Sequence, residues 1–167
     1  MRKNVSWCLV FVLAIFLAVP PTARAARVIL KPLDFKVISL ISTSDVHWRT
    51  PVSIGGEAGS SPMAFTAPLK LPAGATITGL SYWHTTGSGG GFTNVMVGYA
   101  DDNTTWQNEV LIFMGNSGAV TPDFNPIEVT GASQAGEKKV MKGRKYLVTI
   151  QVIPESFVWK VEVTYQK

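Results

Sequence analysis

The chain has 167 residues, with 15 Lys and Arg, 11 Asp and Glu, two histidines and one cysteine. Arg2, Lys3 and Arg24 precede a predicted cleavage site, which leaves 12 basic against 11 acidic residues and a charge of +1 in the remainder. This balance argues against a nucleic-acid partner, which needs a concentrated basic face. The basic run at 138–145 is interpreted as a solvated loop and strand start. Because Cys8 lies before the cleavage site, disulfides, a cysteine nucleophile and thiolate metal sites are excluded.

Residues 1–25 have the pattern of a cleaved secretory signal peptide. Two basic residues are followed by an apolar run from Val5 to Val19 and by Ala23-Arg24-Ala25, which has small residues where a signal peptidase reads. The run has about 15 residues, fewer than the roughly 20 that span a bilayer as a helix. We therefore expect cleavage after Ala25 and a secreted or periplasmic domain with no membrane span. An uncleaved membrane anchor is the alternative.

Alternation of apolar and polar residues dominates 26–167, and it predicts strands rather than helices. The expected strands lie at 35–41, 63–71, 76–85, 92–99, 106–114 and 127–130, with a closing hairpin at 145–165 that turns near Pro154. Residues 42–62 are expected to form a long excursion with one short strand near 52–54. The pattern predicts one domain, 26–167: a two-sheet antiparallel β-sandwich, jelly-roll-like, with about eight strands. A lipocalin-like closed barrel is the alternative.

The segment from Phe65 to Ile77 reads F-T-A-P-L-K-L-P-A-G-A-T-I. It resembles the F-x-A-P-x-x-L-P-x-G-A-x-I segment of uncharacterised secreted bacterial β-sandwich proteins. Near the C-terminus, Gly143, Tyr146, Val148, Ile150, Val161 and Tyr165 are similar to the closing hairpin of the same group. The resemblance implies an exported bacterial jelly-roll-like module, and it implies no reaction and no catalytic residue.

No motif in the chain predicts catalysis. The two histidines, His47 and His84, are isolated, and the chain has no G-x-S-x-G nucleophile motif. Two separated histidines also fall short of a zinc site. We therefore predict that the protein is not an enzyme.

Consecutive oxygen-bearing side chains occur at Asp101, Asp102 and Asn103. Carboxylate and amide oxygens in loops are ligands that Ca²⁺ prefers, so these residues form a candidate calcium site. A simple turn, in which Asp and Asn bond their own backbone, is the alternative interpretation.

Aromatic residues are the stronger candidates for ligand contact, because the C–H faces of sugar rings stack on indole rings. Tyr82 and Trp83 are adjacent in a predicted strand, so one should face the core and the other the surface. Trp159 shares its alternation with apolar residues and is expected in the core. The candidate ligand-binding residues are Trp48, Trp83, Trp106 and His84, with Thr78, Asn94 and Gln107 as candidate polar neighbours.

Two functions follow from this sequence, since β-sandwiches host many. The first is an exported non-catalytic module that binds a polysaccharide or cell-surface glycan through exposed aromatic residues. The alternative is a structural or assembly component of the cell envelope or surface, which could form homo-oligomers.

Overall fold

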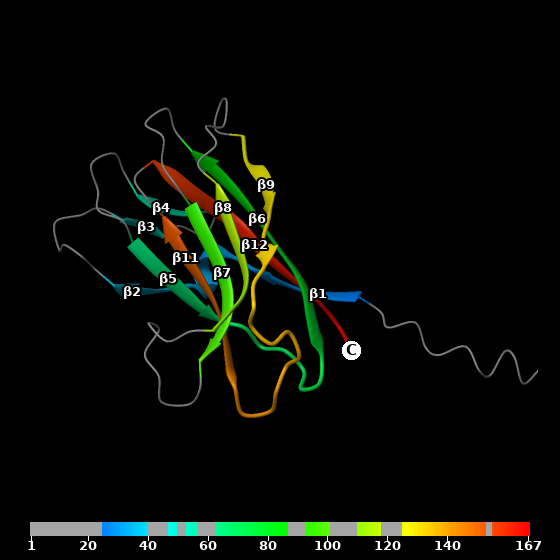
Figure 1. The fold of residues 1–167 in the computed structure, drawn as a ribbon. Helices are drawn as coiled ribbons and strands as arrows, with labels where there is room; N and C mark the ends of the chain where they lie inside the picture. Colours follow the sequence, from blue (N-terminus) through cyan, green and yellow to red (C-terminus); the bar gives the residue numbers. More distant parts are fainter. Residues whose placement is uncertain are drawn as a thin grey trace, which may run out of the picture.

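Alternating apolar residues form two antiparallel sheets that pack face to face as a β-sandwich (Figure 1). The computed structural model describes residues 25–39, 47–49, 53–56, 63–86, 93–100, 110–117, 125–152 and 155–167. Its strands are β1 (Ala25–Leu30), β2 (Lys36–Ser39), β3 (His47–Arg49), β4 (Ile54–Gly56), β5 (Met63–Pro68), β6 (Thr76–Thr86), β7 (Thr93–Ala100), β8 (Val110–Ser117), β9 (Ile127–Thr130), β10 (Ala132–Ser133), β11 (Lys145–Val152) and β12 (Ser156–Gln166).

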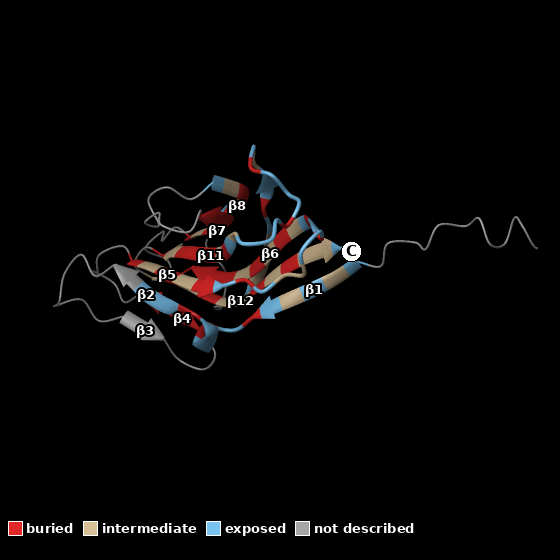
Figure 2. Ribbon diagram, turned by 90° about the horizontal axis from the view of Figure 1, so that it is seen from below, coloured by how far each residue is buried: buried red, intermediate tan, exposed pale blue. Residues whose placement is uncertain are grey.

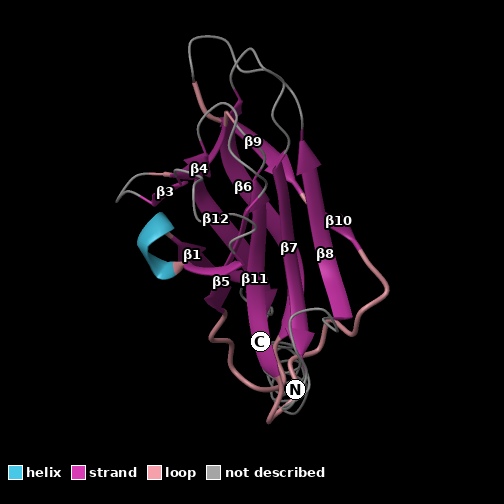
Figure 3. Cartoon of the chain, turned by 90° about the vertical axis from the view of Figure 1, so that its left-hand side faces the viewer, coloured by secondary structure: helices cyan, strands magenta, loops and turns pink. Residues whose placement is uncertain are grey.

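The strands divide between two sheets. Sheet A has the order β3-β4-β12-β6-β9, with β1 also paired to β12, and sheet B has the order β10-β8-β7-β11-β5-β2. Figure 3 shows β7, β8 and β11 in one layer and β6 and β12 in the other. One helical turn, η1 (Pro32–Asp34), joins β1 of sheet A to β2 of sheet B. The two-sheet sandwich predicted from the alternation is confirmed.

The core lies between the sheets, where every long strand contributes one face. Ile77, Leu80 and Val161 of sheet A pack with Phe65 and Val97 of sheet B, and each is 1 % exposed or less. Figure 2 shows buried positions running along β5, β6, β7 and β11, whereas β1 at the edge is largely exposed or intermediate. The second face of each sheet is therefore left for solvent or for a ligand.

The two C-terminal strands do not form the predicted hairpin. β11 pairs with β5 and β7 in sheet B, whereas β12 pairs with β1, β4 and β6 in sheet A. The chain thus crosses between the sheets, with Glu155 at a φ of 62° just before β12. Ile150 of β11 and Val161 of β12 therefore reach the shared core from opposite sheets. The hairpin prediction is wrong, because the two strands join different sheets.

Several short strands add to the eight that were expected. β1, β3 and β10 were not predicted, and the excursion at 42–62 contains both β3 and β4. β8 begins at Val110, and residues 106–109 of the corresponding predicted strand lie outside the described residues. In the described ranges, no helix is long and apolar enough to cross a membrane. Residues 1–24, which hold most of the predicted signal peptide, lie outside those ranges.

Candidate functional site: the outer face of sheet A

The outer face of sheet A is set by the register of β4, β12 and β6. Val158 pairs with Ile54, and both side chains are buried in the core. The next position along β12 is Phe157, which pairs with Gly55 on one side and Thr85 on the other, so this row faces outward. The ring of Phe157 lies over Gly55, where a side chain on β4 would collide with it. The missing side chain of Gly55 thus makes room for an aromatic ring.

A β-bulge places a second aromatic residue on the same face. The register of β12 against β6 shifts between Val158 and Lys160, which leaves Trp159 as the extra residue. Its indole Nε1 donates a hydrogen bond of 3.1 Å to Oγ1 of Thr85. Trp159 is half-buried and is not part of the core, so the expectation that it packs in the core is wrong. The bulge reverses the alternation that led to that expectation.

Trp83 is the third aromatic residue of this face. It lies between Lys160 of β12 and Glu128 of β9 in the sheet register, and it is half-buried. The Nζ of Lys160 lies 3.4 Å from the centroid of the Trp83 ring, in a cation–π contact. Its neighbour Tyr82 points the other way and has no exposed surface. The prediction that one of these two residues faces the core and the other the surface is confirmed.

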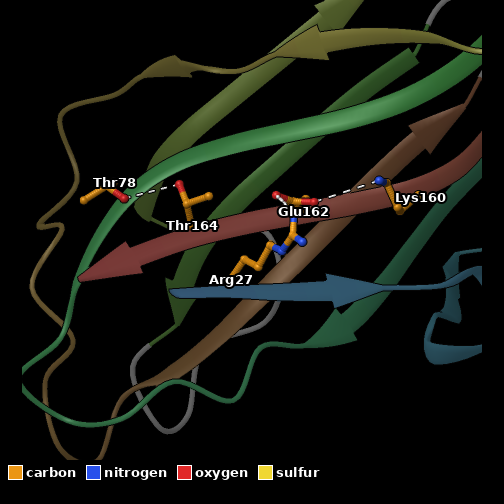
Figure 4. A network of polar contacts seen from close by, with 5 residues as sticks. All are labelled: Arg27, Thr78, Lys160, Glu162 and Thr164. Carbon is orange, nitrogen blue, oxygen red and sulfur yellow. Dashed lines mark hydrogen bonds and ion pairs between the residues drawn. The ribbon is translucent and has the colours of Figure 1, made fainter. Parts of the chain in front are cut away.

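Charged and hydroxyl groups continue the outer face towards the chain termini (Figure 4). The carboxylate of Glu162 lies 3.9 Å from Nζ of Lys160 and 3.5 Å from Nη1 of Arg27. Beyond it, Oγ1 of Thr78 donates a 3.2 Å hydrogen bond to Oγ1 of Thr164. Long exposed ion pairs of this kind contribute little to stability, about 0–1 kcal/mol. The carboxylate of Glu162 nevertheless offers a hydrogen-bonding group in the row of the sheet next to Trp83.

We call Trp83, Phe157, Trp159 and Lys160, with Thr85 beneath them, the aromatic face. The backbone of Trp48 in β3 pairs with Gly55, so this residue stands in the same register row as Phe157 and Thr85. The structure therefore brings two sequence-predicted site residues, Trp48 and Trp83, to one sheet. Thr78, a predicted polar neighbour, also lies on this sheet, whereas Asn94 lies in β7 of sheet B.

The outer face of sheet B has a different chemistry. Asn94 of β7 is flanked by Gln151 of β11 and Asn116 of β8, and its Nδ2 donates a 3.4 Å hydrogen bond to Oε1 of Gln151. The next outward row of the same strands holds Met96, Met114 and Thr149. Among the described residues, this face carries no aromatic ring. Stacking on a sugar ring is therefore available on sheet A and not on the described part of sheet B.

His84 has to be removed from the predicted ligand contacts. Its ring has no exposed surface and lies inside the sandwich, 5.7 Å from the ring of Tyr82. The hydroxyl of Thr86 lies 3.2 Å from Nδ1 of His84, while Nε2 has no partner among the described residues. Burial lowers the pKa of His84 and raises that of Tyr82, so both rings are neutral at pH 7.

The remaining predicted residues fall outside the described ranges: Trp106 and the candidate calcium ligands Asp101, Asp102 and Asn103. Within those ranges, no three His, Cys, Asp or Glu side chains form a group that could hold a metal ion. The calcium site stays a prediction.

Sequence reasoning missed Phe157, Trp159 and Lys160 as members of a site. The alternation of β12 placed Lys160 and Glu162 correctly on the water side. The bulge that turns the two aromatic residues to this side has no signal in the local sequence. The space for Phe157 also depends on Gly55, a residue about a hundred positions earlier in the chain.

Comparisons with known proteins identify the fold. No family model matches this chain, and no curated protein sequence matches it. Among solved structures, the chain is similar to a xylan-binding module of the type CBM15, with a TM-score of 0.56 and 13% sequence identity over 85% of this chain and 96% of that module. This similarity shows the β-sandwich fold.

Two further structures match more loosely. One is the Clostridium thermocellum endo-1,4-β-D-xylanase 10B, comprising CBM22-1 and GH10 modules in complex with xylohexaose, at a TM-score of 0.46 and 15% identity; the match covers 84% of this chain and 26% of that one. The other is TmCBM61 in complex with β-1,4-galactotriose, at a TM-score of 0.41 and 14% identity, covering 84% and 88% of the two chains.

Proposed function

We propose that this chain is an exported, non-catalytic module that binds carbohydrate through the aromatic face of sheet A. The observation that carries the proposal is the convergence of three half-buried aromatic residues, Trp83, Phe157 and Trp159, on one outer sheet face. Large aromatic residues usually fill a core, so three partly exposed rings gathered on one outer sheet face favour a ligand-binding surface. The fold shared with a xylan-binding module agrees with this function.

The polar surroundings of the rings suit a polyhydroxylated ligand. Glu162 offers an acceptor in the next outward row from Trp83, and Glu128 flanks the other side of Trp83. A few fixed polar groups beside apolar contact area are typical of small-molecule sites. A sugar would lie with its C–H face on the rings and its hydroxyls towards these charged groups. Export is part of the proposal and rests on the signal-peptide pattern of residues 1–25.

Affinity electrophoresis in gels that contain xylan, galactan or β-glucan tests this proposal. We expect the purified protein to be retarded by at least one neutral polysaccharide. Trp83→Ala should weaken the affinity for the polysaccharide about tenfold or more, because a central aromatic side chain typically contributes a large part of the binding free energy. Trp159→Phe keeps a ring but loses the donor to Thr85, so its effect should be smaller.

The matched control is Tyr165→Ala, which removes a half-buried aromatic residue on the core side of β12. This variant should bind like the wild type although it is less stable. Retardation by no polysaccharide, or equal loss in Trp83→Ala and Tyr165→Ala, would contradict the proposal.

A structural or assembly role remains the second candidate, because apolar side chains are exposed along one edge of the sandwich. Ile29 of β1, Leu33 of η1 and Val37 of β2 are 43%, 57% and 44% exposed. Exposed apolar residues on edge strands favour association with a second chain.

Size-exclusion chromatography with light scattering decides this second candidate. An assembly role predicts an oligomer that Leu33→Lys with Val37→Lys converts to monomer, while Val110→Lys, at a similarly exposed position in β8, does not. A strict monomer at high concentration would remove this candidate.

A further inference from the structure

A cavity at the end of the sandwich is separate from the aromatic face. It has a volume of about 450 Å³ and lies between the connection from β5 to β6, residues 68–73, and the segment 140–147 that leads into β11. In Figure 1 these two segments run at the lower end of the molecule, in green and orange. The volume falls within the roughly 300–1,000 Å³ of small-molecule sites.

Hydrogen bonds hold both walls of this cavity in place. Val140 donates to the carbonyl of Ala75 at 2.7 Å and accepts from the amide of Gly74 at 2.8 Å. The hydroxyl of Tyr146 accepts from the amide of Met141 at 2.8 Å, and the amide of Leu69 donates to the carbonyl of Tyr146 at 2.8 Å. A cavity with walls fixed in this way loses little conformational freedom when it binds a ligand.

The cavity is apolar inside and basic at its rim. Its lining includes the buried Leu69, Val140 and Tyr146. Four cationic residues also line it: Lys70, Lys142, Arg144 and Lys145. No acidic residue of the described ranges is part of the lining. A concave surface with charges of one sign concentrates ligands of the opposite sign.

The four cations are not equivalent. Arg144 already pairs with Glu137 at 2.8 Å and stacks over the ring of Tyr99 at 4.3 Å. Lys70 and Lys142 are exposed and come from opposite walls of the cavity, and neither has a carboxylate partner among the described residues. Both lysines are therefore available to bind an anionic group at this cavity.

We propose that this cavity binds the anionic group of a charged saccharide: the carboxylate of a uronic acid or a phosphate ester. This inference rests on the proposed carbohydrate-binding function, but it concerns a site other than the aromatic face. It assigns an acidic glycan as the ligand of that second site. The sugar ring contacts Leu71 and Leu147, while its anionic group accepts hydrogen bonds from Lys70 and Lys142.

Isothermal titration calorimetry on the chain without its predicted signal peptide tests this inference. The probes are trigalacturonate, glucose 6-phosphate, inorganic phosphate and neutral xylotriose, each at 20 and 200 mM NaCl. We expect one of the two anionic saccharides to bind more tightly than inorganic phosphate, and the better probe identifies the carboxylate or the phosphate ester as the source of the charge. Lys70→Gln with Lys142→Gln should weaken that binding at least tenfold.

The control is Lys36→Gln with Lys167→Gln, which removes the same charge from two exposed lysines elsewhere. Equal weakening in both double variants, or no binding of either anionic saccharide, would overturn the inference. Neutral xylotriose and Trp83→Ala separate it from the proposed function. If the protein binds neutral xylotriose but neither anionic saccharide, the inference about the cavity fails and the proposed function of the aromatic face stands. If Trp83→Ala weakens the binding of xylotriose but not that of the anionic saccharide, the cavity is a separate site.

Discussion

At the scale of single residues, Lys160 covers the aromatic ring that the proposed function requires. A sugar can stack on Trp83 only when the ammonium 3.4 Å from its centroid moves aside. An exposed cation–π contact is worth about 0.5–1 kcal/mol, which the ligand has to overcome. Lys160 lies at the surface with a 37% exposed side chain, so it can swing away.

Lys160→Ala should therefore strengthen glycan binding about two- to fivefold, because it uncovers the Trp83 ring. Lys160→Met should give less, since the long apolar stem still lies over the ring. The dissociation constant from intrinsic tryptophan fluorescence measures both. Weaker binding in Lys160→Ala would show that the lysine contacts the ligand itself and does not cover its site.

His84 makes the stability of the fold depend on pH. Its pKa is lowered from 6.5 in the folded state by burial, so the unfolded chain binds the proton more readily. The stabilisation linked to the neutral His84 ring is therefore fully present above pH 6.5. It is lost as the pH falls from 6.5 towards the lowered pKa of the folded state. Urea unfolding between pH 8 and pH 5 should show this loss in the wild type.

The variant His84→Gln should flatten that pH dependence, because glutamine cannot titrate. Its stability at pH 8 can be lower than that of the wild type, so the comparison concerns the difference between pH 8 and pH 5 within each protein. An unchanged difference in His84→Gln would assign the pH dependence to other groups.

At the scale of elements, the aromatic face depends on the missing side chain of Gly55 in β4. A methyl group there would overlap the ring of Phe157 and the carbonyl of Ser156. Gly55→Ala should cost about 1–3 kcal/mol of unfolding free energy, as overpacking does, and should weaken glycan binding as well.

The control for this change is Gly79→Ala in β6 of the same sheet. There an added methyl group meets only the hydroxyl of Thr164, at 2.8 Å, and that side chain can rotate away. Chemical denaturation of both variants measures the difference. Equal stability of the two would contradict the close packing of Phe157 on β4.

The extent to which the elements were predictable follows from the range of the interactions that fix them. The opposite orientation of Tyr82 and Trp83 follows from the geometry of one strand, and the sequence predicts it correctly. The position of Trp159 depends on a bulge against β6, and the crossing from β11 to β12 depends on the sheet that each strand joins. Both features depend on pairing with strands that are distant in the sequence, so the alternation within one strand does not predict them.

At the scale of the whole molecule, the fold gathers chemistry from distant parts of the chain. The face of sheet A combines β1, β4, β6, β9 and β12, and the cavity combines residues 68–73 with 140–147. The sequence predicts the sandwich because two-residue alternation recurs in every long strand. It also predicts the basic run at 138–145 as a solvated loop and strand start, and the lysines of that run are exposed. It does not predict that Lys70 lines the same cavity as this run, because that approach depends on the three-dimensional fold.

The most direct measurement of the central claim is NMR titration of the labelled protein with a neutral oligosaccharide such as xylohexaose, following the indole N–H signals and the backbone amides. Binding at the aromatic face predicts that the indole signals of Trp83 and Trp159 shift, together with the amides of Lys160 and Glu162. No shift on addition of the sugar, or shifts confined to Asn94, Gln151 and Asn116 on sheet B, would contradict it.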